Sequence, residues 1–334
     1  QQEMDTAFRV APTSPTTCPG TLAKSTFDEW LKTHVGKFDL VMVNEAHNQP
    51  MSRALIYQML PIMRTEGFSI LAMEALPDAA ATRWINQHGF ALDERSHGFY
   101  LREPIEGEIV RRAKQLGFTL ANYDVFTEQR EQNEAANLAR ILKQHPGKKV
   151  FVVAGYDHIR RSDGRMAERL PKLYDKPFLS IDQLGMGKTN DVMRDVCLSA
   201  DSSGFGRDAG TLTSMRWVHG GRGADVTVVR TGTYVLDRAA ATGNEWLSLG
   251  GDRWRYQFPP DKTCGGPDSV CLVEARYASE SVNAVPADRY LILAGEHAAI
   301  LYLRDGQYAM TYRNIHGAVT RSDSVTVRGG EFVH

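Results

Sequence analysis

Three short apolar segments constrain the fold of this chain more than any other feature. They cover residues 39–47, 70–74 and 150–158, and each has the length and composition of a buried strand. Each segment ends in an acidic residue, a histidine or both, namely Glu45, His47, Glu74, Asp157 and His158. Side chains just beyond the carboxyl ends of strands line the ligand crevice of an open α/β sheet. We therefore expect these five residues to share one rim of a sheet.

Apolar residues at helical spacing separate the strand candidates, as in residues 50–64, 105–116 and 127–144. Further strands are expected at residues 118–122 and 177–181. Strands that alternate with helices form right-handed βαβ units. The chain is therefore predicted to have an α/β fold, with a mostly parallel sheet flanked by helices.

The pattern changes near residue 200, where glycine-rich turns and short strand candidates begin to dominate. Asp305-Gly306 lies between two of these candidates and predicts a hairpin. We expect residues 201–334 to form a β-rich C-terminal extension or to complete the main sheet. Residues 25–200 are predicted to form the α/β core domain that carries the site. Residues 1–24 are rich in Pro, Thr and Ser and are expected to be an irregular leader.

Composition narrows the classes of partner. The 334 residues include 24% charged and 42% apolar residues, and the formal net charge is −1. This balance gives no reason to expect nucleic-acid binding or an acidic membrane surface. No apolar run approaches the roughly 20 residues of a membrane-spanning helix, so no membrane span is expected. The expected partner is a small-molecule or peptide substrate.

The cysteines indicate the redox state of the compartment in which the protein is found. Cys264 and Cys271 are joined by a short segment of turn residues, which suits a local disulfide. Zinc is a weaker alternative there, because the pair lacks C-x-x-C spacing and no histidine is close in sequence. With four cysteines in total, we expect an oxidising compartment, periplasmic or secreted. The alternative is four unpaired thiols in a cytosolic protein.

The predicted catalytic residues are Glu45, His47, Glu74 and His158. If strand geometry continues past Glu45, its side chain and that of His47 point the same way. Two histidines and two carboxylates are suitable ligands for zinc, manganese or iron, so the same four residues are the predicted metal ligands if a metal is bound. Without a metal, a histidine can act as general base on water while a buried glutamate orients it or donates a proton.

Each of these residues also has a structural alternative. Glu45 could cap the helix that begins near Pro50, and Glu74 the helix that begins after Pro77, because a helix N-terminus favours an anion. His158 could be a histidine with satisfied hydrogen bonds in the core. Their shared occurrence at the ends of apolar strands favours a common site.

Four further residues are candidates for substrate binding. Tyr156 could donate a hydrogen bond to an oxyanion or bind an iron porphyrin, and Asp157 follows it on the same rim. Arg161 lies close to His158 in sequence and could hold an anionic group. His97 lies in residues 88–104, which show no clear period and are expected to be a loop or lid.

The order of these motifs resembles the erythromycin esterase-like, ChaN-like and Tiki-like superfamily. The resemblance rests on Asn44-Glu45-Ala46-His47, on Glu74 and on Gly155-Tyr156-Asp157-His158, and it covers roughly residues 38–185. Arg130 lies on a segment similar to the family's arginine-containing helix, which makes it a fifth candidate for substrate binding. The Glu-x-His spacing is most similar to the ChaN-like branch. Asn44 departs from the family pattern, since it stands where a glycine is usual.

The resemblance implies an α/β fold with its site at the strand ends. Esterase-like members hydrolyse a macrolide lactone, Tiki-like members are metal-dependent peptidases, and ChaN-like members are associated with haem. We expect a hydrolase in which His47 or His158 activates water against an ester, lactone or amide bond, with or without a divalent metal. The alternatives are a haem or metal carrier without turnover, with His47, His158 or Tyr156 as ligands, and an inactive descendant that serves as a binding module.

Overall fold

A computed structural model describes residues 23, 25–184, 215–221, 223–229, 244–257, 264, 270–293 and 299–334. The predicted leader lies almost wholly outside these residues, as do Cys18 and Cys197. None of the helices in the described ranges combines the length and apolarity needed to cross a membrane.

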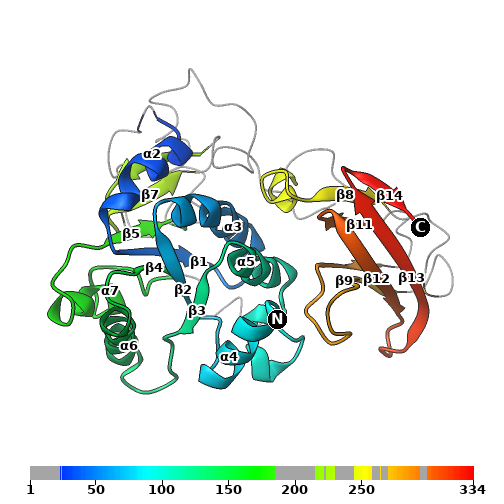
Figure 1. The fold of residues 1–334 in the computed structure, drawn as a ribbon, viewed down its shortest axis with the longest axis horizontal. Coiled ribbons are helices and arrows are strands. Elements are labelled where there is room, and N and C mark those ends of the chain that lie inside the picture. The colour runs from blue at the N-terminus through cyan, green and yellow to red at the C-terminus, as the bar shows by residue number, and fades with distance from the viewer. Residues whose placement is uncertain are drawn as a thin grey trace.

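The main body of the molecule is a seven-stranded sheet in the order β3-β2-β4-β1-β5-β7-β6, with helices on both faces (Figure 1). Its neighbouring strands pair in parallel, apart from the antiparallel pair β6 and β7. The predicted α/β fold with a mostly parallel sheet is therefore confirmed. The strands are β1 (Leu40–Glu45), β2 (Phe68–Met73), β3 (Thr119–Asn122), β4 (Lys149–Gly155), β5 (Leu179–Asp182), β6 (Arg216–His219) and β7 (Val226–Val229).

The helices follow the strands in alternation along the chain. They are α2 (Phe27–His34), α3 (Pro50–Thr65), α4 (Ala79–His88), α5 (Pro104–Gln115), α6 (Arg130–Gln144) and α7 (Met166–Arg169). Short 3-10 turns are η1 (Val35–Lys37), η2 (Arg95–His97), η3 (Tyr100–Arg102), η4 (Leu170–Lys172) and η6 (Glu245–Ser248). The predicted loop at residues 88–104 therefore contains η2 and η3.

Alternation along the central strands divides the core into two layers. Val41 and Val43 of β1 pack on one face of the sheet, while Leu40 and Met42 pack on the other. The first face is covered mainly by α2, α3 and α5, and the second by α6 and α7. Both faces are apolar because crossover helices bury a parallel sheet on both sides, which explains the continuous apolar runs in the sequence.

The C-terminal strands form antiparallel sheets of their own (Figure 1). One sheet has the order β10-β9-β12-β13-β14, and a second pairs β11 with β8. This confirms the predicted β-rich extension, while β6 and β7 join the main sheet. The strands are β8 (Trp254–Gln257), β9 (Cys271–Tyr277), β10 (Asp288–Ile292), β11 (Ile300–Leu303), β12 (Gly306–Arg313), β13 (Val319–Arg328) and β14 (Glu331–Val333).

The hairpin predicted at Asp305-Gly306 is wrong. β11 pairs with β8, whereas β12 pairs with β9 and β13. The Asp305 carboxylate instead accepts hydrogen bonds from the Trp254 indole and from the backbone of Gly329, at 2.9 and 3.0 Å. Asp305 thus contacts β8 and the turn after β13, and the two strands that flank it belong to different sheets.

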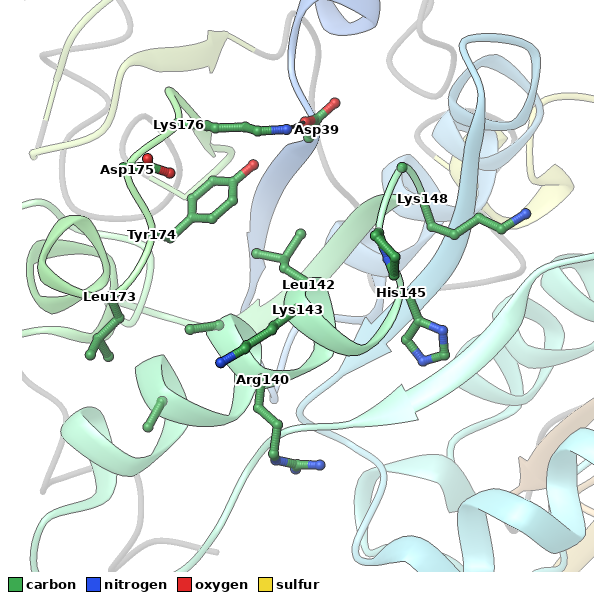
Figure 2. Close-up of a pocket in the computed structure, with 14 residues that line it drawn as sticks. Asp39, Arg140, Leu142, Lys143, His145, Lys148, Leu173, Tyr174, Asp175 and Lys176 are labelled. Atoms are coloured by element: carbon green, nitrogen blue, oxygen red, sulfur yellow. Dashed lines mark hydrogen bonds and ion pairs between the residues drawn. The ribbon is translucent and has the colours of Figure 1, made fainter.

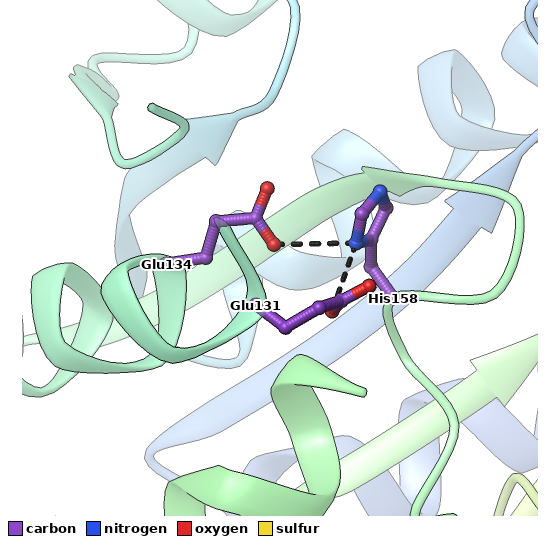
Figure 3. Close-up of side chains that lie close together, drawn as sticks. All are labelled: Glu131, Glu134 and His158. Atoms are coloured by element: carbon purple, nitrogen blue, oxygen red, sulfur yellow. Dashed lines mark hydrogen bonds and ion pairs between the residues drawn. The ribbon is translucent and has the colours of Figure 1, made fainter. Parts of the chain in front are cut away.

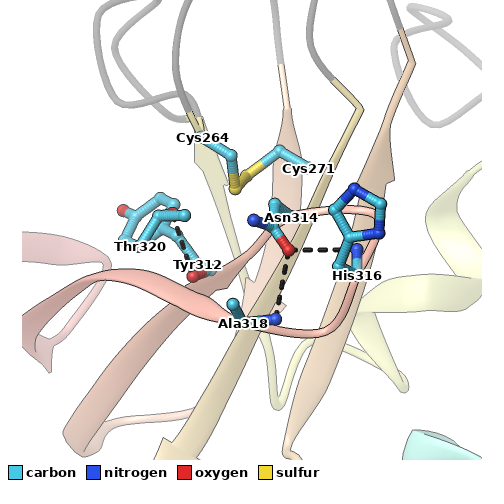
Figure 4. The surroundings of a disulfide bond; sticks show 7 residues. All are labelled: Cys264, Cys271, Tyr312, Asn314, His316, Ala318 and Thr320. Carbon is cyan, nitrogen blue, oxygen red and sulfur yellow. Dashed lines mark hydrogen bonds between the residues drawn. A yellow bond between two sulfur atoms is a disulfide. The ribbon is translucent and has the colours of Figure 1, made fainter.

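The predicted disulfide between Cys264 and Cys271 is present, and it joins the segment before β9 to the first residue of that strand (Figure 4). Cys271 itself is buried in the core of the C-terminal sheets, beside Val273 and Ala275. The bond therefore fixes the entry of the chain into the central part of this sheet.

Arg111 of α5 connects the α/β part to the C-terminal strands. Its guanidinium binds both carboxylate oxygens of Glu280 at 2.7 and 2.8 Å and donates to the Val285 carbonyl at 2.5 Å. It also pairs with Glu108 at 3.1 Å on the same helix. Arg111 is 4% exposed, so this is a buried ion network with its hydrogen bonds satisfied.

We predict that Arg111→Ala lowers the free energy of unfolding by about 3–5 kcal/mol, because Glu108 and Glu280 lose their buried charge partner. Urea denaturation followed by circular dichroism measures the change. The exposed Arg83→Ala is the matched control, and we expect it to change stability by less than about 0.5 kcal/mol. Equal effects of the two substitutions would contradict the prediction.

Candidate functional site

His47 lies between two glutamates at the carboxyl edge of the sheet. β1 ends at Glu45, and two residues later the His47 Nδ1 lies 2.5 Å from the Glu45 Oε1. Its Nε2 lies 3.5 Å from the Glu74 Oε1, a contact too long for a strong hydrogen bond. The His47 side chain is 19% exposed, so solvent can reach the ring. One imidazole nitrogen is therefore held by Glu45, while the other faces Glu74 across a longer gap.

Glu74 connects the two predicted histidines. It directly follows β2, and its carboxylate accepts hydrogen bonds from the Gly155 backbone N–H and, at 2.8 Å, from Arg130 Nη2. Its second oxygen lies 3.8 Å from the His158 Nε2. Glu74 therefore occupies the centre of the cluster, in ion-pair contact with His47, His158 and Arg130.

Gly155 provides the space in which His47 and Glu74 meet. β1 and β4 are parallel, and their register places Gly155 opposite Glu45. A Cβ at position 155 would lie 2.6 Å from His47 Nε2 and 3.0 Å from Glu74 Oε2, closer than atoms can pack. Position 155 therefore requires a glycine, because any side chain there would occupy the space of His47 and Glu74.

His158 is held from the other side by helix α6. Its Nδ1 lies 3.1 Å from Glu131 Oε2 and 3.2 Å from Glu134 Oε2 (Figure 3). Glu131 also binds Arg165 at 2.9 Å, and Glu134 binds Arg130 at 2.8 Å. Neither glutamate was predicted from the sequence. Their i, i+3 spacing on a predicted helix was the available signal, because it places both side chains on one face.

Arg53 supports Glu45 from behind and was also missed. This fully buried guanidinium in the first turns of α3 lies 3.1 Å from Glu45, 3.3 Å from Glu103 and 2.7 Å from Glu106. It also donates to the His47 carbonyl at 3.2 Å. No spacing in the sequence marked Arg53, because its partners come from two other segments, the end of β1 and the start of α5.

Two tyrosines enclose the His47 ring. Tyr100 of η3 stacks on it with the ring centroids 4.0 Å apart, and Tyr156 contacts it edge-on at 4.8 Å. Tyr156 has a positive φ of 40°, and its hydroxyl donates to the Asn48 side chain at 3.3 Å. The structure thus brings Tyr156 to the cluster and adds Tyr100, which lies in the segment predicted to be a loop or lid.

The other predicted substrate-binding residues differ in position. Arg130 contacts Glu74, as described above. Asp157 pairs with Arg160 at 3.5 Å and is partly exposed beside the cluster. Arg161 instead binds Asp225 at 2.7 Å and lies over the Phe178 ring, next to β5 and β7.

His97 packs edge-on against Trp84, with the ring centroids 4.7 Å apart, and accepts a hydrogen bond from the Leu92 N–H. His97 therefore packs against α4 and against the segment that follows this helix, at Leu92. Among the interactions that the structure describes, neither His97 nor Arg161 has a contact with Glu45, His47, Glu74 or His158.

The capping alternatives for the glutamates do not hold. The N-cap of α3 is Gln49, which makes no side-chain capping bond, and the N-cap of α4 is Asp78, which accepts from two backbone N–H groups. Glu45 and Glu74 are therefore left for the ion pairs described above.

Asn44, where a glycine was expected, keeps a regular strand conformation. Its side-chain amide donates to the Tyr156 carbonyl and to Asp182 at 2.8 and 2.7 Å, and its side-chain oxygen accepts from the Gln183 backbone at 2.9 Å. Asn44 thus connects β1 to the segments that follow β4 and β5.

The ion pairs shift the pKa values of both histidines. Burial lowers the pKa of His47, but its contacts with Glu45 and Glu74 outweigh burial and raise it to about 9. Burial likewise lowers the pKa of His158, and Glu131, Glu134 and Glu74 raise it to about 10. Both imidazoles therefore carry a positive charge at neutral pH.

The pKa values of Glu74 and Glu131 shift downwards, opposite to those of the histidines. Burial raises the pKa of Glu74, but His47, His158 and the Gly155 N–H lower it to about 2. The pKa of Glu131 also falls to about 2, because His158 and Arg165 outweigh burial. Burial raises the pKa of Glu134 above its usual value. Glu74 is thus a carboxylate throughout the physiological range, held between imidazolium groups.

The residues that could hold a metal differ from the predicted set. Within the described part of the chain, Glu131, Glu134 and His158 offer ligand atoms that all lie within 4.8 Å of one another. These are suitable ligand types for zinc, manganese or iron. Arg165 and Arg130 already pair with the two carboxylates, so a metal would have to compete with fixed cations. The donor set fits a metal in kind, while its charges are already balanced.

A cavity of about 540 Å³ lies at the opposite edge of the sheet (Figure 2). Asp39, Lys148 and Lys176, which line it, precede β1, β4 and β5 respectively, and the C-terminal end of α6 forms another wall. Asp39 and Lys176 pair at 2.7 Å. Because this cavity lies at the amino ends of the strands, it is separate from the cluster around His47.

Comparison with known proteins adds little. No family model and no curated protein matches the chain. The RRSP effector domain of a Vibrio vulnificus MARTX toxin is 16% identical, with a TM-score of 0.37 over 47% of this chain and 36% of that chain. The type III effector HopBA1 is 14% identical, with a TM-score of 0.39 over 64% of this chain and 97% of that chain.

A structure of cofacial haem binding to ChaN of Campylobacter jejuni is 10% identical, with a TM-score of 0.35 over 65% of this chain and 100% of that chain. At these values the similarities do not establish a shared fold or function.

We predict that replacing Gly155 with alanine displaces the His47 ring while the sheet stays folded. The added methyl group would occupy the space of the imidazole, whereas the backbone of β4 can keep its pairing. The nuclear magnetic resonance titration of His47 measures the effect, and its pKa should move from about 9 towards the usual 6.5. Ala154→Gly, one residue earlier, is the control. An unchanged titration in Gly155→Ala would contradict the prediction.

Stability should fall as the histidines lose their protons. Their pKa values are raised on folding, so their contribution is complete below the unfolded value of about 6.5 and is lost as pH rises through about 9 and 10. We expect the free energy of unfolding to drop between pH 7 and pH 10.5, with a smaller drop in His158→Asn. Urea denaturation at several pH values tests this. Equal drops in both proteins would exclude a contribution from His158.

Proposed function

We propose that this protein is a hydrolase that uses the Glu45–His47 pair to activate water against an ester, lactone or amide bond. The observation that supports this most directly is the orientation of His47. Its Nδ1 is fixed by Glu45 at 2.5 Å, while its Nε2 points towards Glu74 at the partly exposed edge of the sheet. An imidazole that one carboxylate holds at Nδ1, with its Nε2 directed to the partly exposed edge, is an arrangement suited to general-base catalysis.

In this proposal each neighbour has a separate role. Neutral His47 takes a proton from water at Nε2 as the water oxygen attacks the carbonyl carbon, and the Glu45 carboxylate stabilises the imidazolium that forms. When the tetrahedral intermediate collapses and the bond to the leaving alcohol or amine breaks, the imidazolium gives that proton to the leaving group. Arg53, bound to Glu45 at 3.1 Å, keeps that carboxylate in place. Glu74 orients the water, because its oxygen lies 3.5 Å from the same nitrogen.

The oxyanion that forms on the substrate needs a nearby positive charge. Arg130 and protonated His158 are the candidates, since both contact Glu74 at the centre of the cluster. Glu131 and Glu134 keep His158 charged. A divalent metal bound by Glu131, Glu134 and His158 would supply the same positive charge, and the chain's own residues provide it without one.

The Cys264–Cys271 disulfide supports an oxidising compartment, and we propose that the protein is periplasmic or secreted.

A haem-binding role is the second candidate. It is favoured by the aromatic surroundings of His47, where Tyr100 and Tyr156 lie within 4.0 and 4.8 Å of the ring centroid. The ion pairs favour hydrolysis instead, because both His47 nitrogens face carboxylates and would have to leave them to bind iron. A Soret band that appears on haem titration and shifts in Tyr156→Phe would support the haem role over the hydrolytic one.

We predict that His47→Ala lowers kcat/KM by about 10²- to 10⁴-fold, the usual contribution of a general base. A panel of ester, lactone and amide substrates provides the assay, and circular dichroism checks the fold. His316→Ala, in the exposed turn between β12 and β13, is the matched control and should keep full activity. Full activity in His47→Ala would refute the proposed role.

The pH profile gives a second test. Because the pKa of free His47 is about 9, only its minor neutral form is active at pH 7, and kcat/KM should rise about tenfold per pH unit up to about pH 9. A rate that falls over this range would show that His47 acts in its protonated form.

A further inference from the structure

Two phenylalanines stand out because their rings face solvent. Phe99 is 62% exposed and Phe126 is 83% exposed. The other phenylalanines in the described part of the chain are buried or half-buried. Exposing an aromatic ring to water carries a cost in free energy, so two such rings, each in contact with a neighbour of the same cluster, suggest a surface that binds apolar groups.

Both rings are connected to the cluster around His47. Phe99 contacts Tyr100 edge-on at 5.4 Å, and Tyr100 stacks on His47 at 4.0 Å. Phe126 lies 5.0 Å from the Arg130 guanidinium, which binds Glu74 at 2.8 Å. The two phenylalanines come from different segments, one just before η3 and one after β3. We call Phe99, Tyr100 and Phe126 the aromatic rim.

Each charged side chain of the site already has an oppositely charged partner within the protein. Arg53 pairs with Glu45, Glu103 and Glu106. Arg130 pairs with Glu74, Asp124 and Glu134. Arg165 pairs with Glu131, and both histidines contact the carboxylates described above. A charged substrate would have to displace one of these partners. A neutral substrate would leave every pair intact, so the electrostatics favour it.

We propose that the aromatic rim selects neutral acyl substrates that carry bulky apolar groups next to the scissile bond. This inference rests on the proposed hydrolytic function and names its substrate class. The apolar groups pack against Phe99 and Phe126, while the carbonyl group lies beside His47 and Glu74. Phe99 and Phe126 are thus specificity-determining residues rather than catalytic ones.

Binding can be tested without turnover. The neutral, apolar fluorophore N-phenyl-1-naphthylamine becomes brighter when it leaves water. We expect the wild-type protein to bind it, and Phe99→Ser/Phe126→Ser to bind it about tenfold more weakly, as for the loss of aromatic anchors in other interfaces. The control is Val282→Ser/Ile315→Ser, which alters two equally exposed apolar residues in the C-terminal part and should not change binding. Equal binding by both double variants, or no binding by wild type, would overturn the proposal.

Turnover then tests the substrate class. We expect wild-type kcat/KM to be higher for p-nitrophenyl phenylacetate than for p-nitrophenyl acetate or for the anionic mono-p-nitrophenyl succinate. The preference for phenylacetate over acetate should approach one in Phe99→Ser/Phe126→Ser and persist in the control variant. A preference for the anionic ester would overturn the inference. If no ester is hydrolysed but the fluorophore still depends on the two phenylalanines, the hydrolytic function fails while the apolar site stands.

Discussion

The parallel pairing of β1 with β4 is the constraint on which the rest of the site depends. It places Glu45 opposite Gly155, so the residues that follow the two strands leave the sheet side by side. His47 on one side and Tyr156 and His158 on the other are then within reach of Glu74, which arrives from β2 on the far side of β4. Residues more than a hundred positions apart become neighbours through backbone hydrogen bonds alone.

Ion pairs between residues of the protein hold the cluster in place at the ends of these strands. Arg53 holds Glu45 from α3, and Arg130 holds Glu74 from α6. Each buried carboxylate lowers the free energy of a neighbouring cation, which explains why the histidines have raised pKa values and Glu74 a lowered one. Such a network fixes the positions of its members more than it stabilises the fold, since burying the charges costs much of what their attraction provides.

The sequence was sufficient for the parts of this structure that depend on local patterns. Apolar runs and helical spacing predicted the strands and helices of the main sheet, and the ends of those strands pointed to Glu45, His47, Glu74 and His158. Arg53 could not be found in this way, because its partners become neighbours only when α3 and α5 pack together. The same limit applies to Asp305. Its local sequence predicted a hairpin, whereas in the structure its carboxylate binds Trp254 and Gly329, which are distant in sequence.

Helix α5 belongs to two neighbourhoods at once. Near its start Glu106 lies 2.7 Å from Arg53, which supports Glu45. Further along, Arg111 binds Glu280 and Val285 of the segment between β9 and β10. Shortening the chain to its first half would therefore remove Glu280 and Val285, two of the partners of a buried guanidinium on the helix that packs behind the cluster. The C-terminal part therefore supports the edge of the sheet that carries the cluster, and an attempt to isolate a smaller folded unit should retain it.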